Sequence, residues 1–446
     1  MIYLTFVVIP TFQEGVPSDL RNTHANCFVD SMDTGEAERI ARFKIEQSGW
    51  KILSNGYLPT KVTLEDFEHK DIGTQAFKRA SQSGLAIVYV GVSEKSGSAN
   101  PNPERLAFTS DLNLEEYYEL RKAIRLKGQC LYYETANCNE MIEAHSIQRS
   151  GVLSSIAVNN HVMVPSYNHS DLKKNNGRFT LRNHPTSKVS TFRGFCKKHD
   201  NEIFRPIDNQ FLVPTSEQAL LYAYRSLGRE ISVQKNALEN YETQIRNDKL
   251  TSATRKLLTG MAVGTRKSLK NLMQQKEFFE TSHHNRAYDD IQYVAFCART
   301  EPSIVFSGCF YPATGFYHEK IQNLMTDNLD PLLFSYAPME NGWAFLFSWH
   351  KESKATAEAF LGSLANYERK SEQLEDLLFG MVLSHCENLA IAPLWIENME
   401  AGQILRIEEA MSAGASPFSK CEMRNVIDNV KGITDWKFES VIDSRR

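Results

Sequence analysis

The stretches CLYYETANCNEMIEAH, residues 130–145, and FRGFCKKHD, residues 192–200, decide how the middle of this 446-residue chain folds. They contain two separated pairs of cysteine and histidine side chains. In the second pair two residues lie between the ligands, a spacing at which a tight turn directs both side chains at one ion. Sulfur and imidazole nitrogen are the ligands of tetrahedral structural zinc sites. The sequence therefore predicts a structural Zn²⁺ site made of Cys130, Cys138, Cys196 and His199.

The first pair has a wider spacing than is usual for zinc. Seven residues separate Cys130 from Cys138, against a usual gap of about two to four, although a short loop at 135–137 could bring the thiols together. The alternative is that these two cysteines are packed as free thiols, since free cysteine is commonly buried. Eight cysteines in 446 residues are too dilute for a disulfide framework, and with no secretory signal they predict a reducing, cytoplasmic location.

The order of these residues over about 129–204 resembles the zinc-containing treble-clef form of the HNH, or ββα-metal, nucleases. A ligand pair is followed by the dipeptide Ala144-His145, and the second pair is followed at once by the polar Asp200. The resemblance implies that His145 acts as general base on water and that Asp200 helps to hold a catalytic divalent cation, Mg²⁺ or Mn²⁺. It implies a metal-dependent endonuclease that hydrolyses phosphodiester bonds in DNA or RNA. The same segments resemble a zinc-finger-like module of uncharacterised bacterial proteins, some associated with phage defence, which implies a role in antiviral defence.

The sequence departs from the HNH pattern at two positions. Ala144 stands where the family usually has an acidic residue or a second histidine, with Glu143 one residue earlier. The middle asparagine of the family is absent from 190–195, and the spacing does not require the Asn-Asn-His stretch at 159–161 to replace it. These departures favour an alternative, a non-catalytic zinc-dependent nucleic-acid or signal-binding module in a multi-protein assembly. A third hypothesis is a scaffold in a defence assembly.

One stretch of the chain is basic although the net charge is −4. From Arg121 to Arg205 there are 14 Lys and Arg against 6 Asp and Glu, or +8, and the other residues carry 36 against 48, or −12. Basic and aromatic side chains alternate there, so cations could contact phosphates while rings stack on bases. A lysine-rich loop can equally be solvated. The predicted nucleic-acid contacts are Arg149, Lys173, Lys174, Arg193, Lys197 and Lys198.

The spacing of apolar residues predicts an α/β and α+β multidomain protein. The expected parts are a small α/β domain at 1–93, a linker at 94–112, the basic HNH-like zinc module at 113–214, a helical hairpin at 215–282 and an α+β domain with an antiparallel sheet at 283–446. The apolar stripe of the helices at 215–281 fits packing within the chain equally well as a homodimer or another protein partner.

Local signals give further expectations. Gly260 and Gly264 predict a kink or break in the second long helix, because each costs about 1 kcal/mol relative to Ala. Residues 167–190 predict an exposed loop, and 354–383 one helix. Asn341-Gly342 predicts a hairpin with a type I′ turn.

The sequence excludes several function classes. No run approaches the roughly 18 apolar residues of a membrane span, and the apolar run Ile2–Pro10 lacks a basic n-region and a cleavage site, so it predicts a first strand. The phosphate-binding patterns G-x-x-x-x-G-K-[ST] and G-x-G-x-x-G are absent, which disfavours nucleotide-driven motors and dinucleotide cofactors.

For three other clusters, the sequence favours a structural role over a catalytic or metal-binding one. His283-His284 with Asp289-Asp290 could hold a metal ion but is typical of a polar turn. Cys297 and Cys309, on adjacent predicted strands, favour packed thiols over a pair. The stretch His385-Cys386-Glu387-Asn388 lacks the Gly-rich oxyanion turn expected beside a Cys-His nucleophile.

Overall fold

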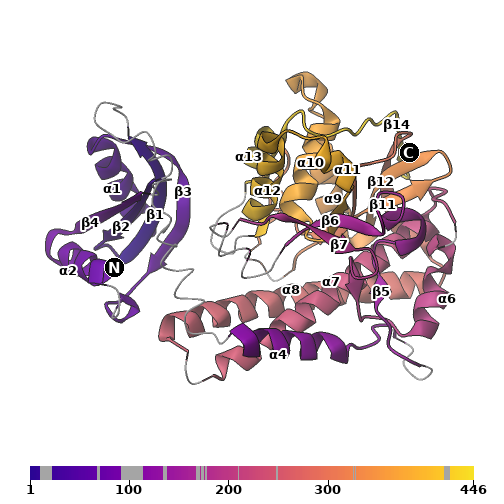
Figure 1. Ribbon diagram of the computed structural model, residues 1–446, viewed down its shortest axis with the longest axis horizontal. Coiled ribbons are helices and arrows are strands. Elements are labelled where there is room, and N and C mark those ends of the chain that lie inside the picture. The colour runs from indigo at the N-terminus through magenta and orange to yellow at the C-terminus, as the bar shows by residue number, and fades with distance from the viewer. Residues whose placement is uncertain are drawn as a thin grey trace. The chain divides into compact units, whose positions relative to one another are not determined.

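A computed structural model of the chain describes residues 1–10, 23–67, 71–91, 114–133, 138–166, 171, 175, 178–208, 210–247, 250–324, 326, 328–415 and 422–445. The contacts within the chain divide it into two compact units (Figure 1). The first is Met1–Asp111 with the short segments 251–254 and 416–421, and the second is Leu112–Leu250, Arg255–Ala415 and Glu422–Arg446. The predicted mixture of helices and antiparallel sheets is confirmed, whereas the predicted linker at 94–112 lies outside the described residues. Among the described helices, none is long and apolar enough to cross a membrane.

The first unit is a four-stranded antiparallel sheet with helices α1 (Thr34–Gln47) and α2 (Asp71–Ser83) packed against it. Its strands lie in the order β3 (Trp50–Lys61), β1 (Ile2–Pro10), β2 (Thr23–Val29) and β4 (Leu85–Gly91). Asp33 caps the start of α1, because its side chain accepts from the backbone N–H of Glu36. Alternate residues of β1 enter two separate cores, one with α1 and one with α2, so the helices cover opposite faces of the sheet.

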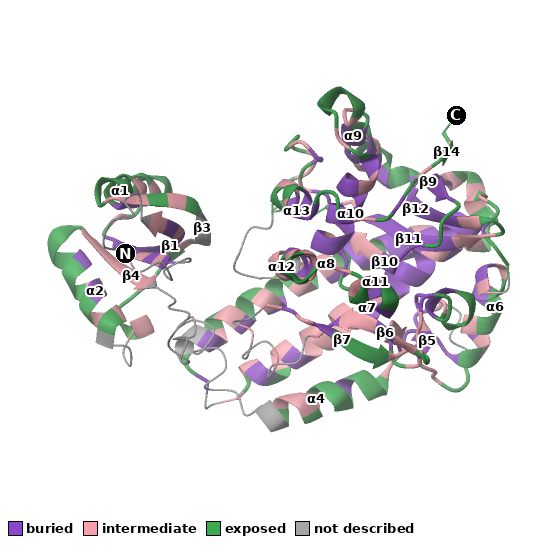
Figure 2. Ribbon diagram, turned by 45° about the horizontal axis from the view of Figure 1, so that its top comes forward, coloured by how far each residue is buried: buried purple, intermediate pink, exposed green. Residues whose placement is uncertain are grey.

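The second unit is built on an eight-stranded antiparallel sheet. Its strands lie in the order β14 (Ser440–Asp443), β9 (Ile291–Ala298), β12 (Gly342–His350), β11 (Leu332–Met339), β10 (Ile304–Phe310), β13 (Leu389–Ile391), β6 (His161–Pro165) and β7 (Leu181–Pro185). Figure 2 shows the central strands as the most deeply buried part of this unit.

Helices cover both faces of the central strands. Along β12, Ala344 and Leu346 point to the core shared with α7 (Ser216–Ile245). Phe345 and Phe347 point to the other face, among rings that α9 (Lys354–Leu364) and α10 (Leu374–His385) contribute. The remaining helices and short strands of the unit are α4 (Leu114–Lys127), β5 (Ala144–His145), β8 (Thr191–Phe192), α6 (Lys197–Asp208), α8 (Ser252–His284), α11 (Pro393–Glu397), α12 (Ala401–Ala415) and α13 (Met423–Val430).

The predicted break in the second long helix is wrong. Helix α8 continues through Gly260 and Gly264, both of which are exposed. Its buried face, which includes Leu258, Leu269 and Leu272, is continuous on either side of the glycines. Burial of that face outweighs the low helix propensity of two exposed glycines.

Three other expectations are corrected. Part of the predicted loop at 167–190 is strand β7, which pairs with β6 along its whole length. The predicted helix at 354–383 is two helices, separated by a turn in which Ser371 has a φ of 54°. The hairpin between β11 and β12 exists, but Met339 pairs with Gly342, so Glu340 and Asn341 form its turn and it is not a type I′ turn at Asn341-Gly342. Gly342 has a φ of 127°, and a Cβ there would lie 2.0 Å from the carbonyl oxygen of Ala298.

Candidate metal centre and adjoining cavity

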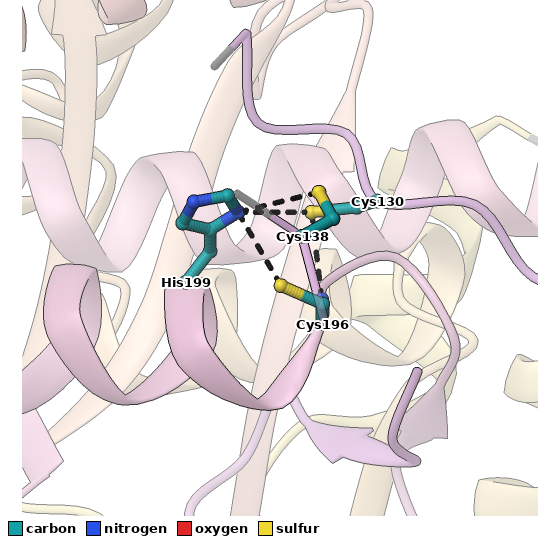
Figure 3. A group of neighbouring side chains, drawn as sticks. All are labelled: Cys130, Cys138, Cys196 and His199. Carbon is teal, nitrogen blue, oxygen red and sulfur yellow. Dashed lines mark hydrogen bonds between the residues drawn. The ribbon is translucent and has the colours of Figure 1, made fainter. Parts of the chain in front are cut away.

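The four predicted zinc ligands converge on one point (Figure 3). The Nδ1 atom of His199 lies 3.4 Å from the sulfur of Cys130, 3.6 Å from that of Cys138 and 3.3 Å from that of Cys196. All four ligand atoms lie within 4.8 Å of one another. In tetrahedral zinc sites, with bonds of about 2.3 Å to sulfur and about 2.0 Å to nitrogen, the two atoms are separated by about 3.5 Å. The cluster therefore has the donor set and the spacing to hold a zinc ion.

Backbone hydrogen bonds bring the two halves of the cluster together. The N–H of Leu131 donates to Gly194 over 2.8 Å, and the N–H of Lys197 donates to Glu140 over 2.9 Å. The N–H of Cys196 donates to the sulfur of Cys130 over 3.4 Å. These contacts bind the segment around the first cysteines to the start of α6, so the wide spacing between Cys130 and Cys138 does not prevent convergence.

A cavity of about 340 Å³ lies beside this centre and contains both predicted catalytic residues. His145 enters it from β5, and Asp200 enters it from the first turn of α6, directly after the ligand His199. The cavity is lined by Ile142, Glu143, Ala144, His145, Gln148, Arg149, Ser150, Asp200, Asn201, Arg205, Asp208 and Arg225.

The hydrogen bond of His145 fixes its tautomer. Its Nε2 atom lies 3.3 Å from the backbone carbonyl oxygen of Thr186. A carbonyl only accepts, so Nε2 carries the proton and the neutral ring keeps a lone pair on Nδ1. Burial lowers the pKa of His145; the bond to Thr186 and the charge of Glu143 oppose that shift, and the charges of Arg149 and Arg225 add to it. The ring is therefore neutral at pH 7 and has the form that a general base needs.

Asp200 has an incompletely satisfied carboxylate. Its Oδ1 atom is buried and has no hydrogen-bond partner among the described residues. Burial raises the pKa of Asp200, the charge of Arg225 lowers it and the charge of Asp208 raises it. A buried carboxylate oxygen without a donor is stabilised by a proton or by a cation, so this residue could act as a ligand to a divalent ion.

The other two carboxylates of the cavity already have cationic partners. Asp208 accepts hydrogen bonds from both terminal nitrogens of Arg225, over 2.5 and 2.7 Å. Glu143 lies 3.6 Å from Arg125 and 3.7 Å from Lys188. Asp200 is thus the cavity carboxylate that has no salt bridge among the described residues.

The residues predicted to contact nucleic acid differ in their exposure and in their neighbours. Arg149 is exposed and lines the cavity. Arg193 is half-buried and donates to the carbonyl of Met141 over 3.2 Å. Lys197 and Lys198 begin α6 beside the metal centre. Lys173 and Lys174 lie outside the described residues.

Sequence reasoning missed several residues of the cavity. Asn201 and Arg205 follow Asp200 on α6 by one and five residues, so they do not occupy the i+3 and i+4 positions that helical spacing would have indicated. Arg225 comes from α7, outside the motif, and no local signal in the sequence points to it. Asn159 and Asn160, considered as replacements for the family's asparagine, have φ values of 50° and 60° in a tight turn and do not line the cavity.

The other candidate clusters have structural roles. Nδ1 of His284 lies 2.6 Å from the hydroxyl of Tyr133 at the end of α8. Cys297 and Cys309 are free thiols on β9 and β10, which β12 and β11 separate, so the predicted adjacency of their strands is wrong. Burial lowers the pKa of His385 to about 4, and its ring packs against Phe310.

No protein-family model, no curated protein sequence and no solved structure matches the chain.

Proposed function

We propose that this chain is a metal-dependent, HNH-like nuclease that hydrolyses phosphodiester bonds in DNA or RNA. The observation that carries the proposal is the shared cavity of His145 and Asp200, directly beside the four-ligand cluster. His145 and Asp200 both line this cavity; the neutral imidazole keeps its lone pair on Nδ1, and the buried Oδ1 of the carboxylate has no hydrogen-bond partner among the described residues.

In the proposed reaction, Nδ1 of His145 removes a proton from a water molecule that attacks the phosphorus atom. Asp200, with Asn201 beside it, would hold the divalent cation, Mg²⁺ or Mn²⁺. When bound, that cation would stabilise the negative charge that develops on the phosphate and on the leaving oxygen. Arg149 and Arg205, both exposed at the cavity, would contact the phosphates on either side of the reacting one.

Zinc has a structural role in this proposal. His199 belongs to the cluster and Asp200 to the cavity, so the ion would fix the first turn of α6 and thereby the position of Asp200. The short β5–β8 ribbon followed by α6 is the order of elements that a treble-clef, ββα-metal module requires, which supports the assignment. A role in antiviral defence is part of the proposal only through the resemblance of the motif.

The experiment is cleavage of supercoiled plasmid and of single-stranded RNA by the purified full-length protein. Mg²⁺, Mn²⁺ or Ni²⁺ is added, and His145→Ala is run beside the wild type. We expect the variant to keep its zinc and its melting temperature and to lose about 10²- to 10⁴-fold in rate. His184→Ala is the matched control, since His184 is exposed on β7 and does not line the cavity.

Equal cleavage by the wild type and His145→Ala would overturn the assignment of the base. No cleavage of either substrate by a zinc-loaded wild type would favour the second candidate, a non-catalytic zinc-dependent binding module. The alanine at position 144, where the HNH family usually carries a polar partner, favours that candidate.

A further inference from the structure

The side chain of Asn388, which lies between α10 and β13, reaches Ser146, the residue next to His145. Its Nδ2 atom donates to Ser146 Oγ over 2.8 Å and to the backbone carbonyl of Ser307 over 3.0 Å. Because the carbonyl can only accept, the contact with Ser307 fixes which end of the amide is the nitrogen. Asn388, Ser146 and Ser307 are all buried, with exposed fractions of 5%, 8% and 3%.

The hydrogen bond continues from Ser146 to Ser190. Ser146 Oγ accepts from Asn388 and lies 2.7 Å from Ser190 Oγ, so its own proton is free to go to Ser190. The N–H of Ile147 donates to the same Ser190 oxygen over 2.9 Å, and the N–H of Ser146 donates to the Ser190 carbonyl over 3.0 Å. Hydrogen bonds arranged in series polarise and strengthen one another in a buried setting.

Ser190 has a strained backbone. Its φ is 61°, in the left-handed region that residues with a Cβ rarely occupy. Such a conformation persists only where the surroundings over-determine it. Here the contacts with Ser146 and Ile147 provide that constraint.

The strained residue lies beside the hydrogen-bond partner of His145. Thr186, whose carbonyl accepts from His145 Nε2, begins the turn that ends at Ser190. His145 itself pairs with Thr191 in the β5–β8 ribbon. The network therefore holds both the strand that carries His145 and the turn that orients its ring.

The hydrogen bonds of Asn388, Ser146 and Ser190 also connect to the core of the second unit. Ser307 belongs to β10, and its hydroxyl lies 2.7 Å from Ser226 Oγ of α7. Ser226 Oγ lies 3.1 Å from Ser335 Oγ of β11. The same residues thus connect the large sheet, the long helix on its face and the base of the proposed reaction.

We propose that Asn388 is a positioning residue, which couples the large sheet to the orientation of His145 through Ser146 and Ser190. Its catalytic consequence rests on the proposed nuclease function. The segment between α10 and β13 then contributes to catalysis without touching substrate.

The test compares Asn388→Ala, Ser146→Ala and the double variant in the full-length protein. We expect kcat for plasmid or RNA cleavage to fall by about 10²-fold, the scale that a small misplacement of a catalytic group causes, with KM and zinc content unchanged. The double variant should lose no more than the larger single variant, because both substitutions break the same chain of hydrogen bonds. Ser146→Ala removes only one oxygen atom, so it can be measured even if Asn388→Ala does not fold.

A second readout does not depend on activity. Amide hydrogen exchange at Ser146 and Ile147 should accelerate by about fivefold in Asn388→Ala, the factor that corresponds to one lost hydrogen bond. Ser384→Ala is the control, since that buried hydroxyl bonds to the carbonyls of Gly380 and Met381 in its own helix. It should leave kcat and the two exchange rates unchanged.

The outcomes separate the inference from the proposed function. Cleavage by the wild type with an unchanged kcat in both single variants would overturn the inference and leave the function standing. If the wild type cleaves nothing, the proposed function fails and the catalytic consequence fails with it. Unchanged exchange at Ser146 and Ile147 in Asn388→Ala would overturn the coupling itself, whatever the activity.

Discussion

His145 donates from Nε2 to the backbone carbonyl of Thr186, and this contact decides which ring nitrogen can accept a proton from water. The bond leaves Nδ1 as the basic atom without help from an acidic side chain. The backbone therefore performs the orienting role that a carboxylate performs in many catalytic histidines. The presence of Ala144 beside His145 is compatible with a functional base for this reason.

The pH dependence of cleavage should follow the lowered pKa of His145. Burial stabilises the neutral ring, so the pKa lies below its ordinary value of 6.5. In the proposed reaction the neutral ring is the active form, so kcat/KM should be constant through neutral pH and fall about tenfold per pH unit below that pKa. Plasmid cleavage measured from pH 5 to pH 8 checks this, and a fall that begins above pH 6.5 would contradict it.

Loss of one cluster ligand should release the zinc and unfold the region around it. In Cys196→Ala we expect zinc content to drop from about one ion per chain to near zero, because ligand binding and folding are coupled in such sites. Elemental analysis and thermal melting measure the two effects. Cys297→Ala, which removes a buried free thiol from β9, should keep its zinc. Full zinc content and an unchanged melting temperature in Cys196→Ala would show that Cys196 is not a ligand of a structural zinc ion.

Nucleic-acid affinity should depend on Arg149 and on salt. We expect log Kd to change linearly with log salt concentration, and Arg149→Ala to reduce the slope by about 0.9 on duplex DNA. Binding is measured without divalent cations in the His145→Ala background, so that no substrate is cut. The exposed Arg299, outside the basic stretch, provides the control substitution to alanine. If the His145→Ala protein and its Arg149→Ala and Arg299→Ala variants all have the same slope, Arg149 does not contact a phosphate.

Replacing the exposed glycines of α8 should stabilise the protein. An added Cβ at Gly260 or Gly264 meets no atom within 4 Å, so each alanine should raise the free energy of unfolding by about 0.5–1 kcal/mol. Gly380→Ala in α10 is the opposite case, since its Cβ would lie 2.5 Å from Ile427 Cγ1, and it should destabilise. Urea unfolding of the three variants decides between these outcomes.

The candidate metal centre could be predicted from sequence because cysteine and histidine side chains are themselves the ligands of structural zinc sites. Cys196 directly precedes α6 and His199 is the third residue of that helix, so a short spacing in the sequence brings the two side chains together. The closure of the wide gap after Cys130 could not be predicted, because it depends on backbone hydrogen bonds to the distant segment at 194–197.

The wider surroundings of the cavity were beyond sequence reasoning for a different reason. Arg225 and Asn388 reach the site from a core helix and from the C-terminal region, where their neighbours in sequence carry no related signal. Which buried polar side chains meet is decided by packing of the large sheet. The uninterrupted α8 follows the same rule, because burial of one face overrides the local preference of Gly260 and Gly264.

The adjacency of His199 and Asp200 makes this stretch intolerant of any change in length. One peptide bond separates a ligand of the metal cluster from a residue of the cavity. Successive residues of a helix are rotated by about 100°, so one residue inserted between them would turn the carboxylate to another side of α6 while leaving the metal ligands in place. A single residue inserted between His199 and Asp200 should therefore yield a protein that still loads zinc but does not cleave, whereas an insertion between Cys196 and His199 should also lose the zinc.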